Sequence, residues 1–237
     1  MAKNRSVTVV VGLLGAAIVY GLLRFNYTGS WYGFHYDRYL IANMMALLWI
    51  PMLTVLLVFR ADPASFGFAP VSSRRVWGWV GVLFVGVLVL VVLVARKEAF
   101  QTYYPIFRRF DDFRFLSAFA SDPQGYLTVN PFTSAPWLML YAEASYGMYL
   151  FCWEFFFRGY LLFGLQKSLG SVAAVILQAI AFGLLHWGKP EMIPSFAGGI
   201  VLGMLALNAK SFLPAFVLHW AASISLDVLV VAFRPHG

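Results

Sequence analysis

Seven apolar runs, each long enough to cross a lipid bilayer, dominate this sequence. A helix needs about 20 predominantly apolar residues to span the hydrocarbon core. We expect membrane-spanning helices at residues 6–23, 40–59, 76–95, 137–165, 171–187, 194–209 and 212–233. The sequence therefore predicts an all-α, multi-pass transmembrane helix bundle with about seven spans.

The composition favours a membrane protein and excludes several soluble classes. Charged residues make up only 11% of the 237 residues, whereas a soluble domain has about 25%. A single cysteine, Cys152, excludes a disulfide-stabilised secreted domain. The net charge of +7 is spread over short loops, which is typical of membrane surfaces, so we expect a lipid bilayer and no nucleic acid as partner. The positive-inside rule does not decide the orientation, and the sequence says nothing of the oligomeric state.

We expect one integrated membrane domain with two parts. Residues 1–136 hold N-terminal transmembrane helices and an interfacial loop segment, and residues 137–237 hold a helical core. Within residues 96–136, charged residues alternate with aromatic ones, a pattern typical of a segment that lies among lipid headgroups. The four prolines of this segment fit an ordinary solvated loop equally well.

Ionisable side chains within the expected spans are the candidates for function, because a charge in hydrocarbon is costly. Glu154, His186 and His219 occur on three different spans. Counted from the neighbouring turns, they lie within about two helical turns of one depth, so they could meet inside the bundle. Arg158 follows Glu154 by four residues, the spacing at which an acid and a base pair on one helix.

The same three side chains leave two kinds of chemistry open. Glu154, His186 and His219 could activate water directly, or they could bind zinc with water as the fourth ligand. No H-E-x-x-H motif is present. We therefore prefer direct activation of water and expect no cofactor, with zinc as the alternative.

Three motifs in the second half resemble those of the CAAX protease and bacteriocin-processing enzyme family, also called CPBP or Abi. The stretch Trp-Glu-Phe-Phe-Phe-Arg-Gly at residues 153–159 is similar to the family motif E-E-x-x-x-R. Phe182-x-x-x-His186 is similar to F-x-x-x-H, and His219-x-x-x-Ser223 to H-x-x-x-N/D. The resemblance covers residues 137–233 and includes the eukaryotic type II CAAX prenyl endopeptidase among its members.

The resemblance implies an intramembrane endopeptidase that cleaves a membrane-tethered protein by glutamate and histidine activation of water. Glu154 would be the general base, held by Arg158. His186 would assist the water or protonate the leaving amine, and His219, oriented by Ser223, would stabilise the oxyanion. Phe182 would support the site. We expect such a protein in the cytoplasmic membrane of a bacterium.

Two departures from the family pattern leave other functions open. The first acid of the pair is Trp153 here, and the last motif ends in Ser223 rather than Asn or Asp. The alternative from a different class is a non-catalytic membrane scaffold or a bacteriocin-immunity-type protein on the same fold. A small transporter is a further alternative, which the absence of two similar halves with interrupted helices disfavours.

Overall fold

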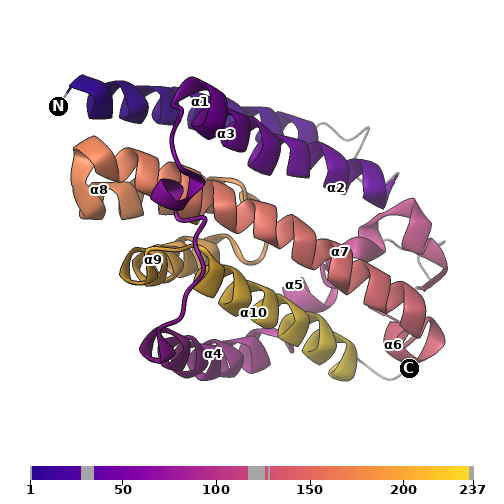
Figure 1. Ribbon diagram of the computed structural model, residues 1–237. Coiled ribbons are helices and arrows are strands. Elements are labelled where there is room, and N and C mark those ends of the chain that lie inside the picture. Colours follow the sequence, from indigo (N-terminus) through magenta and orange to yellow (C-terminus); the bar gives the residue numbers. More distant parts are fainter. Residues whose placement is uncertain (1, 28–34, 117–125, 128, 235–237) are drawn as a thin grey trace.

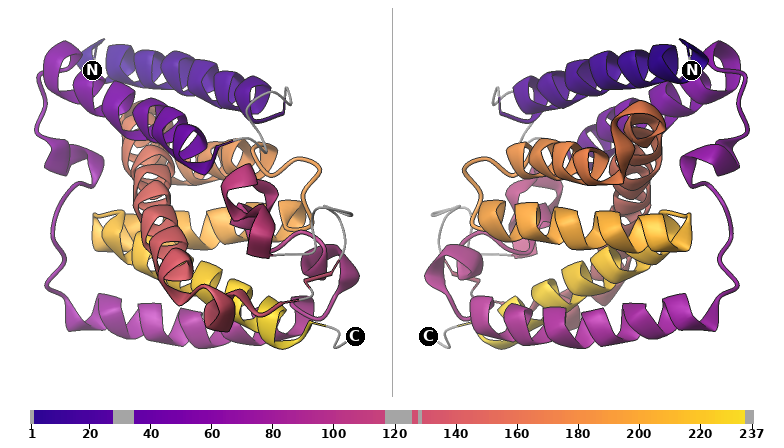
Figure 2. Two further views of the ribbon diagram at one scale, coloured as in Figure 1. Left: turned by 90° about the vertical axis from the view of Figure 1, so that its right-hand side faces the viewer. Right: turned by 90° about the vertical axis from the view of Figure 1, so that its left-hand side faces the viewer.

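A computed structural model describes residues 2–27, 35–116, 126–127 and 129–234. These residues form a helix bundle without any strand, as the two views of Figure 2 show. The prediction of an all-α fold is confirmed. The most extensive contact joins the successive helices α8 (Leu162–Leu184) and α9 (Met192–Ala209). Helices far apart in the sequence also pack together, such as α1 (Ala2–Tyr27) against α8 and α4 (Arg74–Val94) against α10 (Leu213–Ala232).

Six helical stretches among the described residues are long and apolar enough to cross a membrane, close to the seven that we expected. They are Asn4–Asn26, Tyr36–Val58, Arg74–Val94, Pro136–Leu184, Met192–Ala209 (α9) and Leu213–Ala232. The fourth stretch contains two of the predicted spans, 137–165 and 171–187. At Gly170 its backbone has φ 80° and ψ 169°, a conformation that only glycine adopts readily, and there the chain turns back (Figure 1).

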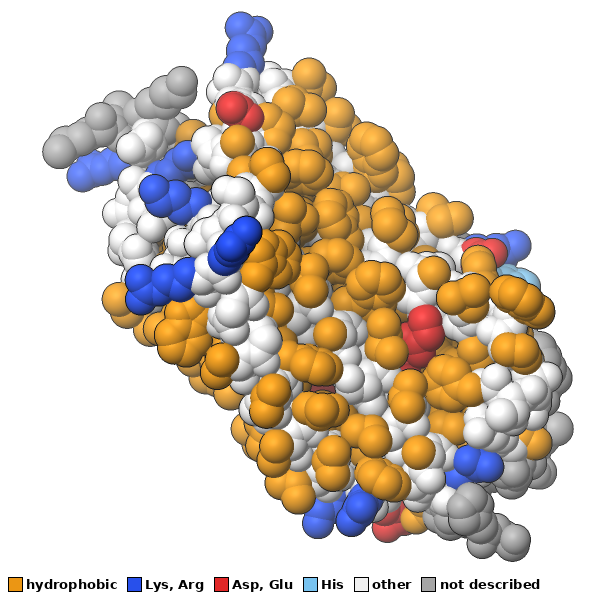
Figure 3. Space-filling model, turned by 60° about the horizontal axis from the view of Figure 1, so that its bottom comes forward, with side chains coloured by type: hydrophobic (Ala, Val, Ile, Leu, Met, Phe, Trp, Pro, Cys, Tyr) orange, Lys and Arg blue, Asp and Glu red, His pale blue; other side chains and the backbone are white. Residues whose placement is uncertain are grey.

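The outer surface of the bundle is suited to hydrocarbon. Large apolar side chains such as Val82, Val85, Leu90 and Leu93 on α4 are exposed. The space-filling view shows a broad apolar surface, with most Lys and Arg side chains toward its ends (Figure 3). Soluble monomers do not expose apolar patches of this extent. The protein is an integral, multi-pass membrane protein.

The longest helical stretch changes its winding at the candidate site. The α-helix α7 runs from Pro136 to Glu154 and is followed by a π-helical segment, Phe155–Leu161, before α8 begins. Every side chain of this segment is buried. A Cβ atom on Gly159 would lie 2.9 Å from the carbonyl oxygen of Phe66, so only glycine allows this close approach. The segment is thereby packed into the centre of the bundle.

The described part of the segment after α4, within residues 96–136, packs against the helices of the bundle. It forms α5 (Glu98–Gln101) and 3-10 turns at Ile106–Arg109 and Asp111–Leu116. The rings of Phe110 and Phe113 are buried against Tyr36 of α2 (Tyr36–Met44) at centroid distances of 5.2 and 5.1 Å. These aromatic residues therefore have partners in the bundle, and the interfacial position of the segment stays a prediction. Residues 117–125 and 128 lie outside the described residues.

Candidate active site

Glu154 lies at the centre of a buried network that joins α7 to α10. Its Oε1 atom accepts a hydrogen bond from Arg158 Nη1 at 3.0 Å and another from His219 Nδ1 at 2.7 Å. Both Glu154 and Arg158 have fully buried side chains. A buried charge is tolerated only when it is paired and hydrogen-bonded. The network therefore ties the last residue of α7 to the first half of α10.

The two histidines are held with the same ring nitrogen protonated. His186, two residues beyond the end of α8, has Nδ1 2.9 Å from the carbonyl oxygen of Phe182. A carbonyl oxygen and a carboxylate only accept hydrogen bonds. Nδ1 must therefore carry the proton in His186, which faces Phe182, and in His219, which faces Glu154. In each neutral ring this leaves Nε2 with a free lone pair.

Phe182 is the common neighbour of the charged groups. Its ring centroid lies 4.7 Å from that of His186 and 5.8 Å from that of His219. The guanidinium carbon of Arg158 lies over the ring at 4.1 Å, a favourable cation–π geometry. The three motifs thus meet around one aromatic side chain. Phe182 and Glu154 are buried, while the side chain of His219 is 22% exposed.

Ser223 lies one helical turn beyond His219 on α10. Among the described residues its hydroxyl makes no hydrogen bond to His219, whose Nδ1 atom is bonded to Glu154 instead. The carboxylate, rather than the serine, orients this imidazole in the structure. The role of Ser223 in the chemistry stays a prediction.

Trp153 occupies the position of the first motif acid and forms an apolar wall beside His186. Its ring is buried and lies 5.8 Å from the imidazole of His186 and 5.3 Å from Phe157. Within the described part of the chain, the indole Nε1 atom has no hydrogen-bond partner. The side chain therefore contributes packing, and no carboxylate replaces the missing one at this place.

We expect Trp153→Phe to retain the stability and any activity of the protein within a few-fold, because it removes only an unpaired N–H group. Trp153→Ala should lower the free energy of unfolding by about 3–5 kcal/mol, because it leaves a cavity. Thermal unfolding in detergent and cleavage by reconstituted protein would measure both. If Trp153→Phe were as inactive as Trp153→Ala while remaining folded, the indole nitrogen would have a chemical role.

Two further acids of the expected spans form a second buried pair. Glu143 on α7 and Asp227 on α10 are buried and lie near each other. Neither oxygen of the Glu143 carboxyl has a hydrogen-bond partner among the described residues. The indole of Trp220 donates to the backbone carbonyl of Glu143 at 3.2 Å, which adds a contact between the same helices. The available signal was that both acids lie in apolar spans without a basic residue four positions away.

The loop that follows His186 is covered by the segment after α4. The Tyr104 hydroxyl lies near the Glu191 carboxyl, and burial raises the pKa of both groups. Within the segment, the guanidinium of Arg109 lies 4.2 Å from the ring centroid of Tyr103. Through Tyr104, the segment forms part of the surroundings of the loop after His186.

The alternative zinc set is not assembled in this structure. Within the described ranges, no three His, Cys, Asp or Glu side chains lie close enough together to hold a metal ion. Oε1 of Glu154 is already shared by Arg158 and His219. The choice between direct activation of water and zinc stays a prediction.

The comparison with protein families agrees with this geometry. Residues 135–225 match the family described as "Type II CAAX prenyl endopeptidase Rce1-like". Searches of curated proteins and of solved structures gave no match. The matched region contains Glu154, Arg158, His186 and His219, and the resemblance of the motifs is confirmed. Residues 135–225 of this chain are therefore similar to the Rce1-like family of type II CAAX prenyl endopeptidases.

Proposed function

We propose that this protein is an intramembrane endopeptidase that hydrolyses a peptide bond in a membrane-tethered protein. The family match supports a CAAX-protease-like enzyme in general terms. The observation that carries the proposal is the 2.7 Å hydrogen bond between His219 Nδ1 and Glu154 Oε1. A buried carboxylate that orients an imidazole makes the other ring nitrogen a stronger base.

The geometry favours His219 as the group that accepts a proton from the attacking water. Glu154 is then the residue that orients His219. As the oxygen of a water molecule attacks the scissile carbonyl carbon, one water proton passes to Nε2 of His219. The imidazolium that forms is stabilised by the Glu154 carboxylate. Nε2 then donates this proton to the leaving amine as the C–N bond breaks. The new carboxylic acid releases its proton to water, and the products are a carboxylate and an amine. Arg158 holds the Glu154 carboxylate in place.

His186 would position the attacking water. Its Nδ1 proton is engaged by the carbonyl oxygen of Phe182, so its Nε2 can only accept a hydrogen bond while the ring is neutral. A water molecule held between Nε2 of His186 and Nε2 of His219 would have both hydrogens directed at acceptors. Its lone pair would then be available for the carbonyl carbon.

The proposal is tested by the peptides that the protein releases in a membrane. New protein termini in membranes that contain the wild type should be absent from matched membranes that contain Glu154→Gln. Quantitative mass spectrometry of termini would detect them. Identical sets of termini would favour the alternative of a non-catalytic scaffold. The observation that favours this alternative is Trp153 at the position of the first motif acid.

The variant Trp153→Glu further distinguishes the peptidase from the non-catalytic scaffold. Because the side chain at this position is buried among aromatic rings, a carboxylate there should lower the stability and give no gain in cleavage. A large rise in activity would instead mean that the native site is a weakened form of the family site.

Chelators should leave activity unchanged. If the water is activated by His219, Glu154 and His186 alone, EDTA or phenanthroline has nothing essential to remove. Metal analysis of the purified protein should then find less than stoichiometric zinc. A reversible loss of cleavage on chelation that added zinc restores would favour the metal alternative.

A further inference from the structure

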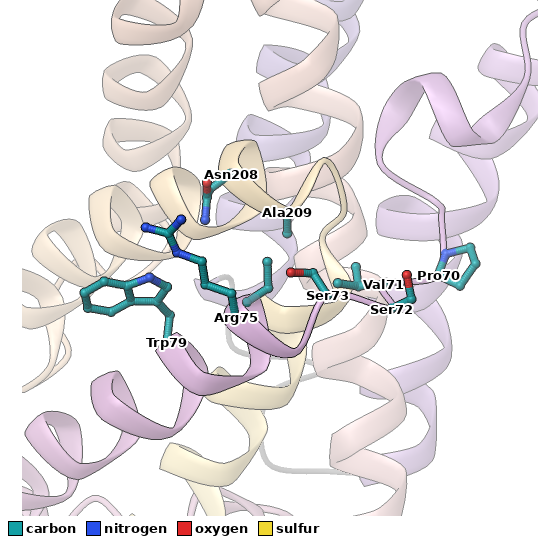
Figure 4. Close-up of a pocket in the computed structure, with 9 residues that line it drawn as sticks. Pro70, Val71, Ser72, Ser73, Arg75, Trp79, Asn208 and Ala209 are labelled. Atoms are coloured by element: carbon teal, nitrogen blue, oxygen red, sulfur yellow. The ribbon is translucent and has the colours of Figure 1, made fainter.

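A cavity far from the candidate active site lies where α4 begins and α9 ends. Its volume is about 420 Å³, and its lining includes Ser72, Ser73, Arg75, Trp79 and Asn208 (Figure 4). These side chains offer hydroxyl, guanidinium, indole and amide groups but no carboxylate. Arg75 makes no ion pair with any described residue. The lining is therefore suited to a negatively charged group.

The backbone adds donors to the same cavity. The α4 helix has 21 residues, and its first N–H groups have no capping hydrogen bond from the Ser73 side chain. Only the N–H groups of Val76 and Trp77 bond back to the Ser73 carbonyl. The unsatisfied N–H groups and the helix dipole favour an anion at this end. They supplement Arg75, which supplies the full charge.

The cavity is fixed by bonds between its two walls. Ser211 Oγ donates to the Ala69 carbonyl at 2.6 Å, and the backbone N–H of Phe212 donates to the Gly67 carbonyl at 3.2 Å. The indole of Trp77 donates to the Val71 carbonyl at 3.1 Å. The loop before α4 is thus held against the turn after α9. A ligand would meet a preformed site, which lowers the entropic cost of binding.

The surrounding surface has a strong excess of positive charge. The described chain segments at this end of the bundle are residues 4–5, 59–75, 166–170 and 208–212 (Figure 1). These segments contain six Lys and Arg and a single acid, Asp62, whose carboxylate accepts a hydrogen bond from the backbone N–H of Ala64 at 2.9 Å. Such a surface attracts anionic lipids.

An apolar stripe runs from the cavity along α4. Arg75, Trp79, Val82, Val89 and Leu93 follow one another at intervals close to one or two helical turns. Trp79, Val82, Val89 and Leu93 are all exposed. Gly86, between them, has no atom within 4 Å of where a Cβ would lie, so the stripe is shallow at its middle. A tryptophan at the polar end of such a stripe is typical of the membrane interface.

We propose that this cavity binds the phosphate of an anionic membrane phospholipid, whose acyl chain lies along the stripe on α4. Arg75 contacts the phosphate, the Ser72 and Ser73 hydroxyls and the α4 N-terminus donate to it, and Trp79 covers the glycerol region. The site is separate from the Glu154 network, and it does not depend on whether the protein is a peptidase.

The test compares Arg75→Gln with Arg74→Gln, a matched control that removes the same charge from the adjacent residue, which does not line the cavity. Native mass spectrometry would count the lipids retained from nanodiscs of phosphatidylglycerol and phosphatidylcholine. Arg75→Gln should reduce bound phosphatidylglycerol at least about fivefold. Arg74→Gln should change it little, and Arg75→Lys should be intermediate, since lysine cannot bind phosphate bidentately.

Two further results would overturn the proposal. Equal losses in both glutamine variants, with unchanged thermal unfolding, would mean that lipid is attracted by the basic surface as a whole. Displacement of the lipid by millimolar inorganic phosphate would mean that the cavity binds free phosphate. We expect inorganic phosphate to fail, because it cannot use the stripe on α4.

Discussion

Glu154→Gln should lower the rate of peptide hydrolysis by about 10³- to 10⁴-fold, as loss of the orienting carboxylate does in a carboxylate–imidazole pair. Gln keeps the size of the side chain and one acceptor oxygen, so the protein should still accumulate in membranes. It cannot stabilise the imidazolium that His219 becomes. Its amide can also rotate to donate toward Nδ1, which would favour the wrong tautomer. Cleavage of a membrane-tethered substrate in proteoliposomes is the measurement.

Glu143→Gln is the matched control for this variant. Glu143 is another buried acid on α7, but its neighbour is Asp227 and it lies outside the Glu154 network. The control should therefore keep most of the activity. Full cleavage by Glu154→Gln would mean that the carboxylate has no part in the mechanism. Equal losses of activity in the two variants would mean that the substitutions disturb α7 in general.

Arg158→Met should lower the free energy of unfolding by about 3–5 kcal/mol, the cost of leaving one member of a buried ion pair without its partner. Methionine fills similar space in the aromatic surroundings of Phe157 and Phe182. The uncompensated carboxylate of Glu154 is then the main cause of the loss. Thermal unfolding in detergent, followed by near-UV circular dichroism, would measure it.

The double variant Arg158→Met with Glu154→Gln distinguishes stability from chemistry. It removes both charges, so most of the lost stability should return, whereas hydrolysis should stay as low as in Glu154→Gln. If the second substitution restored no stability, the Arg158–Glu154 contact of 3.0 Å would carry no coupling energy, and the arginine would act through its packing alone.

The helices and the approach of Glu154 to His219 followed from simple features of the sequence. Run length gives the spans, and residue counting from the turns placed the acid and the two histidines near one depth. Depth says nothing of rotation about the helix axis, however. The pairing of Glu143 with Asp227 depends on how α7 and α10 face each other, which no local pattern records.

The segment after α4 shows a different limit of prediction from the sequence. Aromatic and basic residues in alternation are typical of headgroup regions, and the same side chains are equally able to fill a groove between helices. Phe110 and Phe113 pack on Tyr36 because α2 presents an aromatic surface there, and this surface exists only in the assembled bundle. The protonated Nδ1 atom of His219 likewise follows from a tertiary contact, that with Glu154, whereas that of His186 follows from a local contact with Phe182.

The direction in which Glu154 points depends on the number of residues in the π-helical segment Phe155–Leu161. A π-helical hydrogen bond encloses one residue more than an α-helical one, which is the local result of inserting a residue into an α-helix. Each residue turns an α-helix by about 100°. Loss of a single residue here would rotate Trp153 and Glu154 against everything beyond Leu161. Insertions and deletions in this short stretch can thus change the orientation of Glu154 during evolution while every charged side chain is conserved.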